Sequence, residues 1–295
     1  MKIQFLNGGL ANQTFQYIFT RFAEIKDPDN GPWYLDDSFF FVHDVHNGYE
    51  LEKVFNLHPN LLSQYFDEDV WEYMIEKKRD ENKSIPQLLL ENGIDLYMIA
   101  ETSNHSQWNP FDGIIESIKP NEFYPELTSL PNDIYFHGYW INKHYFDTYR
   151  NEFLNELTMP PITEESNIKY ADLIRKTRSV SIHVRRGDFV NVGWALSEDV
   201  IRNLVITMKE SIPDMTLFIF SDDIPWCKGR EKELGFNLPK EIIYIEGNEG
   251  ERAYRDMQLM SMCKNMIIGT SSFNYLAALL NRNLENYINI TGREI

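Results

Sequence analysis

Short apolar runs alternate with longer amphipathic stretches through the second half of the chain. The apolar runs predict strands at 179–186, 216–220, 241–245 and 265–269. Apolar residues at helical spacing predict the helices around them, at 164–176, 197–211, 251–262 and 273–281, with one more after residue 223. Strands that alternate with helices of this length are typical of a parallel, doubly wound α/β sheet.

The start of the chain has the same pattern. Residues 2–6 predict a strand, Asn7-Gly8-Gly9 a turn, and the apolar stripe of residues 11–25 a helix. A strand at 133–140 and a helix at 143–157 predict another strand–helix pair. We therefore expect a nucleotide-binding-like α/β unit here as well.

Residues 30–130 have the weakest pattern of the chain. They are rich in aromatic and acidic side chains, and only two stretches, near 61–79 and 84–92, predict helices. We expect an irregular insertion of the kind that recognises a variable substrate.

A domain boundary is predicted where the helix at 143–157 meets Met159-Pro160-Pro161, because proline cannot continue a helix. With 295 residues, the chain is long enough for two domains of ordinary size. We place them at 1–160 and 161–295.

Composition narrows the class of protein. A hydrophobic share of 43% predicts a folded chain, and a formal net charge of -17 argues against a nucleic-acid or anionic-membrane binder. Two cysteines make no disulfide framework, and no segment reads as a signal peptide or a membrane span. We expect a cytoplasmic protein, with peripheral contact at the inner face of the membrane left open.

The sequence HVRRGD, at the end of the strand 179–186, is the strongest candidate for chemistry. Alternation along a strand places His183 and Arg185 on one face, near the edge where open α/β sheets bind ligands. Arg185 and Arg186 would bind phosphate and form a local positive site in an acidic protein. The alternative is an ion pair between Arg186 and Asp188 beside a half-buried histidine.

A second candidate follows the strand 265–269. Gly269 is followed by Thr270, Ser271 and Ser272, at the start of a helix. Hydroxyl residues there either cap the helix or, together with free backbone amides, bind an anion. Facing Arg185, this turn would complete a two-sided diphosphate clamp.

Three weaker motifs remain. The adjacent Asp222 and Asp223 would hold a metal or a ribose hydroxyl, or cap the following helix, a role that we expect for Asp222. Because adjacent side chains diverge and no His/Cys cluster has ligand spacing, we expect no bound metal. Asp256, within a Met-rich stretch, would accept two hydrogen bonds from guanine. The first glycine turn does not have the G-x-G-x-x-G pattern. Gly8 and Gly9 would nevertheless let a ligand approach the backbone closely, and Asn12 and Gln13 would offer it neutral hydrogen-bonding groups.

Taken together, these motifs resemble the α-1,2-fucosyltransferases of glycosyltransferase family 11. The matching blocks span nearly the whole chain in the family order: GGLANQTFQY (8–17), FHGYWINKHYF (136–146), HVRRGD (183–188), FSDDIPWCK (220–228), DMQLMSMCKN (256–265) and GTSSFNYLAALLN (269–281). Two departures stand out: Asn265 replaces a frequent histidine, which would alter nucleotide contacts, and Asn274 to Leu276 replace frequent tryptophans, which would repack the helix.

The resemblance implies a GT-B fold, with two facing Rossmann-like domains and the active site in the cleft between them. The carboxyl-terminal domain would bind GDP-fucose, and the amino-terminal domain an oligosaccharide or glycolipid acceptor. The implied reaction is inverting transfer of L-fucose to a galactoside hydroxyl in α-1,2 linkage, building a cell-surface glycan, without a metal or other cofactor. Transfer from a different nucleotide sugar, or a non-catalytic nucleotide- or glycan-binding protein, remains the alternative.

The resemblance also implies roles for the candidate residues. Arg185 would stabilise the β-phosphate of the departing GDP, and Asp188 would be the base that deprotonates the acceptor. His183 and Asp256 would recognise the nucleotide. Thr270, Ser271 and Ser272 would complete the phosphate site.

Overall fold

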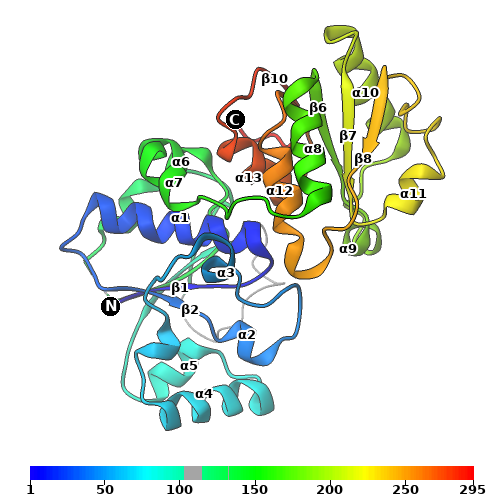
Figure 1. Cartoon of the computed structure of the whole chain (residues 1–295). Helices are drawn as coiled ribbons and strands as arrows, with labels where there is room; N and C mark the ends of the chain where they lie inside the picture. The colour runs from blue at the N-terminus through cyan, green and yellow to red at the C-terminus, as the bar shows by residue number, and fades with distance from the viewer. Residues whose placement is uncertain (103–114, 132) are drawn as a thin grey trace. The chain divides into compact units, whose positions relative to one another are not determined.

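The computed structural model describes residues 1–102, 115–131 and 133–295. The chain divides into two units, Met1–Thr158 (unit 1) and Met159–Ile295 (unit 2). Each unit has its own five-stranded parallel sheet and its own hydrophobic core (Figure 1).

The sheet of unit 2 has the strand order β10-β9-β6-β7-β8. Its strands are β6 (Ser179–Val184), β7 (Thr216–Ser221), β8 (Glu241–Tyr244), β9 (Asn265–Ile268) and β10 (Asn286–Asn289). The chain winds outward from β6 to β8 and then returns to the other side of β6 with β9. The order therefore reverses between β6 and β9, which is where doubly wound sheets bind ligands.

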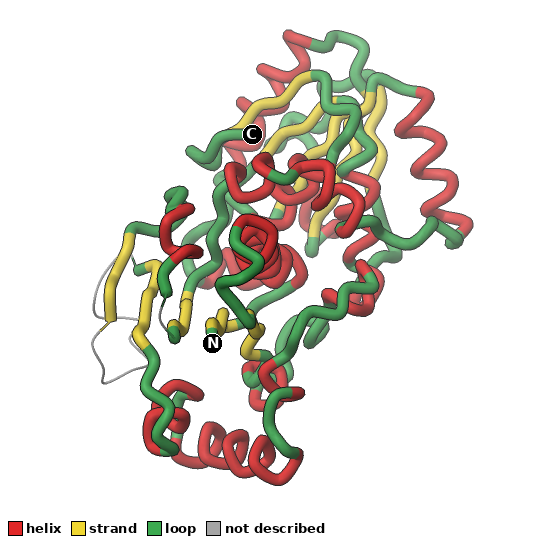
Figure 2. The backbone as a smooth tube through the Cα atoms, turned by 90° about the vertical axis from the view of Figure 1, so that its left-hand side faces the viewer, coloured by secondary structure: helices red, strands yellow, loops and turns green. Residues whose placement is uncertain are grey.

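Helices cover both faces of this sheet. The larger ones are α8 (Glu165–Lys176), α10 (Glu198–Ser211), α12 (Tyr254–Met260) and α13 (Ser272–Leu280), and two short ones, α9 (Gly187–Asn191) and α11 (Ile224–Lys228), follow β6 and β7. Val180, Ile182 and Val184 of β6 pack in one cluster with the apolar face of α10. His183, on the opposite face of the strand, contacts Phe273 of α13. Figure 2 shows the helices flanking the strands.

The sheet of unit 1 has the order β2-β1-β5-β3-β4. Its strands are β1 (Lys2–Phe5), β2 (Trp33–Asp36), β3 (Tyr97–Glu101), β4 (Ile115–Ile118) and β5 (Ile134–His137). The prediction of an irregular insertion at 30–130 is therefore wrong, because β2, β3 and β4 come from this region. Two of them, β2 and β4, form the edges of the sheet, where a strand is only partly covered and does not need a continuous apolar run.

The helices of unit 1 are α1 (Leu10–Lys26), α2 (Phe39–Val42), α3 (Leu51–Phe55), α4 (Glu68–Glu81), α5 (Ile85–Glu91), α6 (Lys143–Thr148) and α7 (Arg150–Glu156). Phe19 of α1 stacks on Trp140 at a ring distance of 4.1 Å in an aromatic core. The predicted helix 143–157 is in fact α6 and α7, because Tyr149 between them has φ -128° and ψ 44° and packs its ring against Phe22. Among the described helices, none has the length and apolarity needed to cross a membrane.

Candidate functional site

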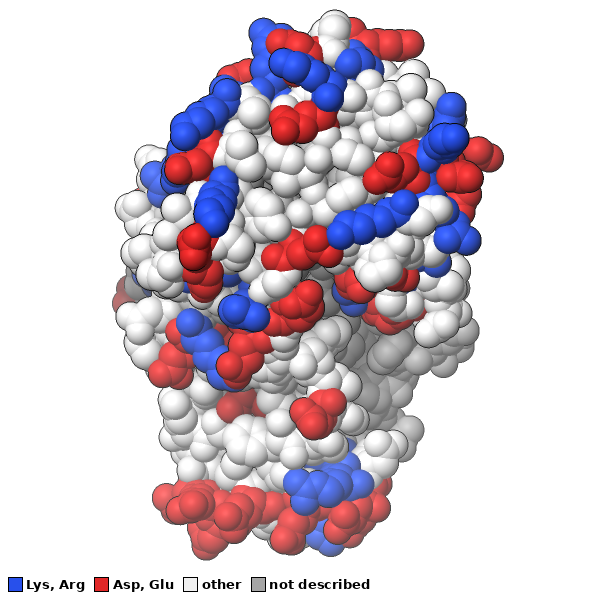
Figure 3. Space-filling view, turned by 45° about the vertical axis from the view of Figure 1, so that its right-hand side comes forward, with Lys and Arg blue, Asp and Glu red and all other residues white. Residues whose placement is uncertain are grey.

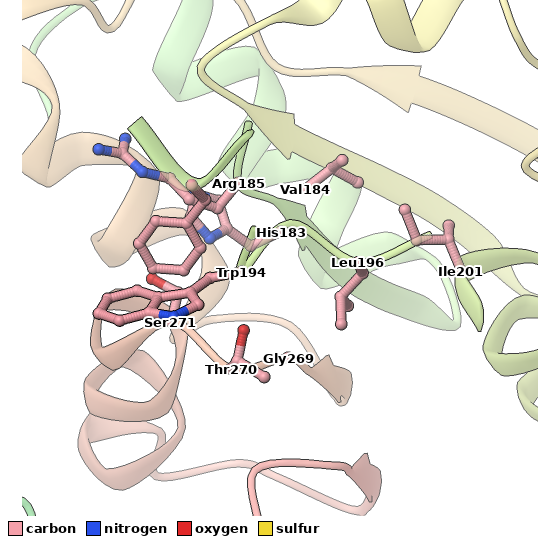
Figure 4. A pocket seen from close by; sticks show the side chains of 10 residues that line it. His183, Val184, Arg185, Trp194, Leu196, Ile201, Gly269, Thr270 and Ser271 are labelled. Atoms are coloured by element: carbon pink, nitrogen blue, oxygen red, sulfur yellow. The ribbon is translucent and has the colours of Figure 1, made fainter. Parts of the chain in front are cut away.

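A pocket in unit 2 lies at the carboxyl ends of β6 and β9, where the strand order reverses. Residues from the two strand ends, from α9, from the segment that follows α9 and from α10 line it: His183, Val184, Arg185, Phe189, Trp194, Leu196, Ile201, Gly269, Thr270 and Ser271 (Figure 4). The structure thus brings four predicted site residues together, namely His183, Arg185, Thr270 and Ser271. Because both strands are parallel and point the same way, their following loops meet at one edge.

Arg185 leaves the end of β6 and is held by two carboxylates. Its Nη2 lies 2.8 Å from Oδ1 of Asp188, and its Nη1 lies 2.9 Å from Oδ2 of Asp222. In Figure 4 the guanidinium extends away from Gly269 and Thr270. A guanidinium has five N–H donors, so these two bonds leave further donors for an anion.

Arg186 has a different environment. Its backbone N–H donates to Oδ1 of Asp222 at 2.8 Å, and its guanidinium lies 3.7 Å from the ring centre of Trp226. The ion pair considered between Arg186 and Asp188 is not formed, since Asp188 pairs with Arg185. Asp223 lies 3.9 Å from Nε of Arg186, so carboxylates lie close to both arginines.

The prediction that Asp222 caps the helix after β7 is wrong. Asp223 caps α11, because its side chain accepts a hydrogen bond of 3.0 Å from the backbone N–H of Trp226. Asp222 instead bonds to Arg185 and to the backbone of Arg186. Asp222 is therefore part of the support of the arginine site.

His183 is neutral in this environment. Burial, with the nearby positive charge of Arg185, lowers the pKa of His183 to about 3. Its Nδ1 is buried and has no hydrogen-bond partner among the described residues. A neutral imidazole with an unpartnered ring nitrogen in a pocket wall offers one hydrogen bond to a ligand.

The loop after β9 has both capping and pocket-lining residues. Ser271 caps α13 by accepting a 3.2 Å hydrogen bond from the backbone N–H of Phe273. Thr270 is exposed and lines the pocket. The side-chain amide of Asn274, one turn into α13, is buried, and neither of its polar atoms has a partner in the part of the chain that the structure describes.

The two departures from the family pattern lie at opposite ends of this sheet. Asn265 begins β9, and its amide bonds to the backbone carbonyl of Ser179 and to the side chain of Asn286. It therefore ties strands together at the end of the sheet away from the pocket. Asn274 is the departure near the pocket, with its Nδ2 3.7 Å from where a Cβ on Gly269 would lie.

An aromatic wall of the pocket was not identified from the sequence. Phe189 and Trp194 meet edge to face at a ring distance of 5.7 Å, and Trp194 remains 65% exposed. Both lie in a stretch, 189–196, with several apolar residues but no helical spacing. Apolar residues without helical spacing, close after a strand end, were the available signal in the sequence.

Asp256 lies on α12 and does not line the pocket. Its carboxylate accepts a 2.7 Å hydrogen bond from Nδ2 of Asn248, which pairs with Asn167 through both of their amides. Burial raises the pKa of Asp256 to about 7, although the bond from Asn248 favours the ionised form. Asp256 is thus a carboxyl group that titrates near neutral pH.

The predicted glycine-turn residues belong to unit 1 and lie after β1. Gly8 has φ +78°, and a Cβ there would lie 2.8 Å from Nδ2 of Asn12, so the turn requires glycine. Gly9 precedes the first residue of α1 with extended backbone. The turn therefore brings the backbone and Asn12 to the carboxyl edge of this sheet.

Gln13 is fully buried and acts inside unit 1. Its Nε2 donates to the carbonyls of Gly8 at 2.8 Å and of Gly48 at 2.9 Å, and its Oε1 accepts from the backbone N–H of Glu50 at 2.9 Å. With every polar atom of its amide bonded to the backbone, Gln13 fixes the segment 48–50 to the glycine turn.

Comparison with known proteins identifies the family. Residues 118–292 match the family described as Glycosyl transferase family 11. An Escherichia coli protein named alpha-1,2-colitosyltransferase is 31% identical over 281 residues, which cover 93% of this chain and 86% of that protein. The chain belongs to glycosyltransferase family 11. The resemblance found in the sequence motifs is confirmed, and the protein is a glycosyltransferase.

Other relatives agree with this family 11 assignment. The E. coli O-antigen biosynthesis glycosyltransferase WbnK is 24% identical over 290 residues, covering 94% of this chain and 89% of that protein. The crystal structure of the NodZ alpha-1,6-fucosyltransferase, soaked with GDP-fucose, superposes with a TM-score of 0.50 at 11% identity over 95% of this chain and 92% of that one. This fold likeness and the two parallel sheets confirm the predicted GT-B class.

The remaining predicted residues of this family 11 enzyme stand at different distances from the pocket. Asp188, on α9, pairs with Arg185, and Arg186 is the next residue after Arg185. Neither Asp188 nor Arg186 lines the pocket. Ser272 begins α13 directly after the pocket loop. Among the described residues, no group of three or more His, Cys, Asp or Glu side chains is arranged to hold a metal ion.

One face of the glycosyltransferase carries side chains of both charge signs. On the face drawn in Figure 3, acidic and basic side chains are interspersed, and no continuous basic surface is present. Acidic side chains gather at the lower end of that view, the height at which Figure 1 places α4.

Gly187→Ala should disturb the arginine site. A Cβ at Gly187 would lie 2.7 Å from Oδ2 of Asp222, the oxygen that binds Arg185. The carboxylate would have to move, so we expect kcat for sugar transfer to fall about tenfold, as for other small misplacements of a positioning group. Gly229→Ala is the matched control, because its Cβ would meet only backbone oxygens at 3.5 Å or more. Equal rates for the two variants would contradict the prediction.

Proposed function

We propose that this enzyme transfers L-fucose from GDP-fucose to a galactoside hydroxyl, with inversion and in α-1,2 linkage. The pocket at the reversal between β6 and β9 is the observation that carries the proposal, because it joins Arg185, the unpartnered His183 and the start of α13. The motifs shared with α-1,2-fucosyltransferases support the donor. The acceptor is an oligosaccharide or glycolipid, and unit 1 is its side of the enzyme.

In this proposal, the diphosphate binds between Arg185 and the amino end of α13. Free backbone amides and the helix dipole favour an anion at Thr270 and Ser272, next to the cap residue Ser271. As the bond between sugar and phosphate breaks, negative charge develops on the β-phosphate. The guanidinium of Arg185, with its donors beyond Asp188 and Asp222, stabilises that charge.

His183 and Asp188 take the other roles at this edge of the sheet. Neutral His183 gives one hydrogen bond from its unpartnered Nδ1 to the donor. Asp188 is 59% exposed and has one oxygen on Arg185, which leaves the second oxygen to take the proton of the acceptor hydroxyl. The step needs no metal or other cofactor in this scheme, because cationic and backbone groups stabilise the leaving diphosphate.

A donor panel tests the proposal. Purified protein is incubated with GDP-fucose and a set of galactosides, and both GDP release and the linkage of the product are measured. We expect acceptor-dependent GDP release and a product with fucose on the 2-hydroxyl. Tight GDP-fucose binding without turnover on any acceptor would favour a non-catalytic binding protein. Acceptor-dependent release of the nucleotide from a different nucleotide sugar would show that the enzyme uses another donor.

Colitose is the second candidate for the transferred sugar, because the E. coli relative with 31% identity is named a colitosyltransferase. Colitose is fucose without its 3-hydroxyl group. A site that hydrogen-bonds this hydroxyl would reject the sugar that lacks it, since the buried partner would stay unpaired. Comparing kcat/KM for GDP-fucose and GDP-colitose therefore decides between the two donors.

The product is proposed to become part of a cell-surface glycan. The motif resemblance implies this outcome, and the relative WbnK is named for O-antigen biosynthesis. The enzyme would act in the cytoplasm, and with a glycolipid acceptor it would work peripherally at the inner face of the membrane. Vesicles with and without the acceptor lipid, in a sedimentation assay, test that last point.

Asp256→Asn should weaken GDP binding and remove its pH dependence. An ionised carboxylate accepts two hydrogen bonds from the guanine N1–H and amino group, whereas an amide accepts with one atom only. Because the pKa of Asp256 is about 7, the affinity of wild-type protein for GDP should fall as the pH drops from 8 to 6. Calorimetry with GDP and with inosine diphosphate, which lacks the amino group, checks both effects.

The stability of Asp256→Asn is a control for its folding, because the substitution should weaken GDP binding but stabilise the folded protein at pH 8. Burial raises the pKa of Asp256 above its ordinary 3.8, so the folded protein holds the proton more tightly than the unfolded chain. Wild-type stability therefore falls as the pH rises from about 4 to about 7. Asp256→Asn should unfold at higher urea than wild type at pH 8, with the difference shrinking toward pH 5. Unchanged GDP affinity at both pH values would exclude guanine contact.

A further inference from the structure

A second pocket lies in unit 1, at the carboxyl end of β2. It is lined by Asp37, Phe40, Phe41 and Tyr49, and its open space measures about 420 Å³. Like the pocket of unit 2, it lies where a parallel strand ends, since Asp37 is the residue that follows β2. No residue of this pocket was among the candidates from the sequence.

Three phenylalanines in a row form most of the short helix α2, and none of its residues is buried. Phe41 is 48% exposed, although its ring also contacts Trp71 edge to face at 5.7 Å. Phe40 and Tyr49 face each other with ring centres 6.2 Å apart. One exposed ring and two half-buried rings that line the same pocket indicate a binding surface.

Asp37 supplies the polar group of this pocket. Its side chain is nearly buried, and its carboxylate accepts hydrogen bonds from Ser63, at 3.1 Å from the backbone N–H and 2.6 Å from Oγ. Each carboxylate oxygen accepts more than one hydrogen bond, so both oxygens keep capacity for a ligand donor. Beside it, the buried Oγ of Ser38 has no partner in the described part of the chain.

Hydrogen bonds from Gln13 fix the backbone on both sides of Tyr49. Gln13 binds the carbonyl of Gly48 and the N–H of Glu50, the two neighbours of Tyr49. The aromatic wall is therefore pre-organised by the glycine-turn motif of the family. A rigid wall reduces the entropy lost on binding.

We propose that this pocket binds a sugar ring of the acceptor, with the aromatic rings against its C–H face and the Asp37 carboxylate accepting hydrogen bonds from its hydroxyl groups. A hexose has one face of C–H groups and a rim of hydroxyl donors, which matches rings on one side and a carboxylate on the other. The identity of the sugar as a galactoside rests on the proposed function. The existence of the subsite does not, because it follows from the pocket itself.

Phe41→Ser tests the pocket without a buried change, and Asp37→Asn tests its polar group. Tyr73→Ser is the matched control, since Tyr73 is 50% exposed on α4 and does not line the pocket. We expect both pocket variants to raise the acceptor KM about 10-fold or more, as truncation of a well-placed contact does. The Kd for GDP and the slow hydrolysis of GDP-fucose without acceptor should not change.

Direct binding separates this proposal from the proposed function. Saturation-transfer NMR of a galactoside on the wild-type chain should give a signal that Phe41→Ser weakens and Tyr73→Ser keeps. If the protein turns over no GDP-sugar yet binds the galactoside in this way, the function fails and the subsite stands. If turnover is normal and Phe41→Ser changes neither the NMR signal nor the acceptor KM, the subsite is overturned.

Discussion

Replacing Arg185 with alanine should lower the kcat of sugar transfer by about 100- to 1,000-fold, as the loss of one positioned charge-stabilising donor does in other enzymes. Arg185 directly follows β6 and lines the pocket, where Asp188 and Asp222 fix the direction of its guanidinium. The β-phosphate gains charge only as the sugar leaves, so the loss should appear in kcat more than in KM for the donor. GDP release at saturating GDP-fucose and acceptor measures it.

Two further variants make this result specific. Arg185→Lys keeps the charge without the planar fork and should retain part of the rate. Arg178→Ala removes an arginine that is 62% exposed and paired with Asp214 at 3.2 Å, and it should leave kcat unchanged. If Arg185→Ala reacted as fast as Arg178→Ala, the leaving-group role of Arg185 would be excluded.

The position of this site was predictable because parallel strands align their carboxyl ends. Apolar runs located β6 and β9, and the residues that follow them, Arg185 and Thr270, then had to meet at one edge of the sheet. In a doubly wound sheet the strand order typically reverses next to the first strand of the domain, which here is β6. Pattern and topology were sufficient for these residues.

The partners of the arginines were not predictable. Asp222 and Asp223 are adjacent and chemically identical, and only the backbone at Asp223, with φ -143° and ψ 67°, turns its side chain back onto α11. Asp222 is left to bind Arg185. Whether a carboxylate caps a helix or pairs with a guanidinium depends on such dihedral angles, which residue type does not fix.

Four described strands, β2, β3, β4 and β10, were missed by the sequence pattern, and of these only β3 lies inside its sheet. Three of them, β2, β4 and β10, are edge strands, and β10 reads Asn-Tyr-Ile-Asn with both ends polar. An edge strand pairs on one side only, so its side chains need not be uniformly apolar. The pocket beside β2, with Asp37 and α2, was hidden for the same reason.

Arg255 is a buried charged side chain of unit 2. Its side chain is only 3% exposed, and its guanidinium donates to the carbonyls of Pro160 at 2.7 Å and Pro161 at 3.0 Å. It also binds Oε1 of Gln258 at 2.7 Å and Oε1 of Glu164 at 3.2 Å. One side chain on α12 therefore holds the segment that leads into α8.

Arg255→Met should lower the free energy of unfolding by about 3 kcal/mol, because the methionine fills much of the volume but leaves the carbonyls and Glu164 without their donor. Glu164→Gln should cost about 1 kcal/mol, since Arg255 keeps its carbonyl acceptors. Arg175→Met is the matched control, as Arg175 is 61% exposed and pairs with Asp172 at the surface. Urea unfolding, with hydrogen exchange of α12 and of residues 160–164, measures all three. Equal stability of Arg255→Met and Arg175→Met would show that the buried guanidinium contributes no more than a surface pair.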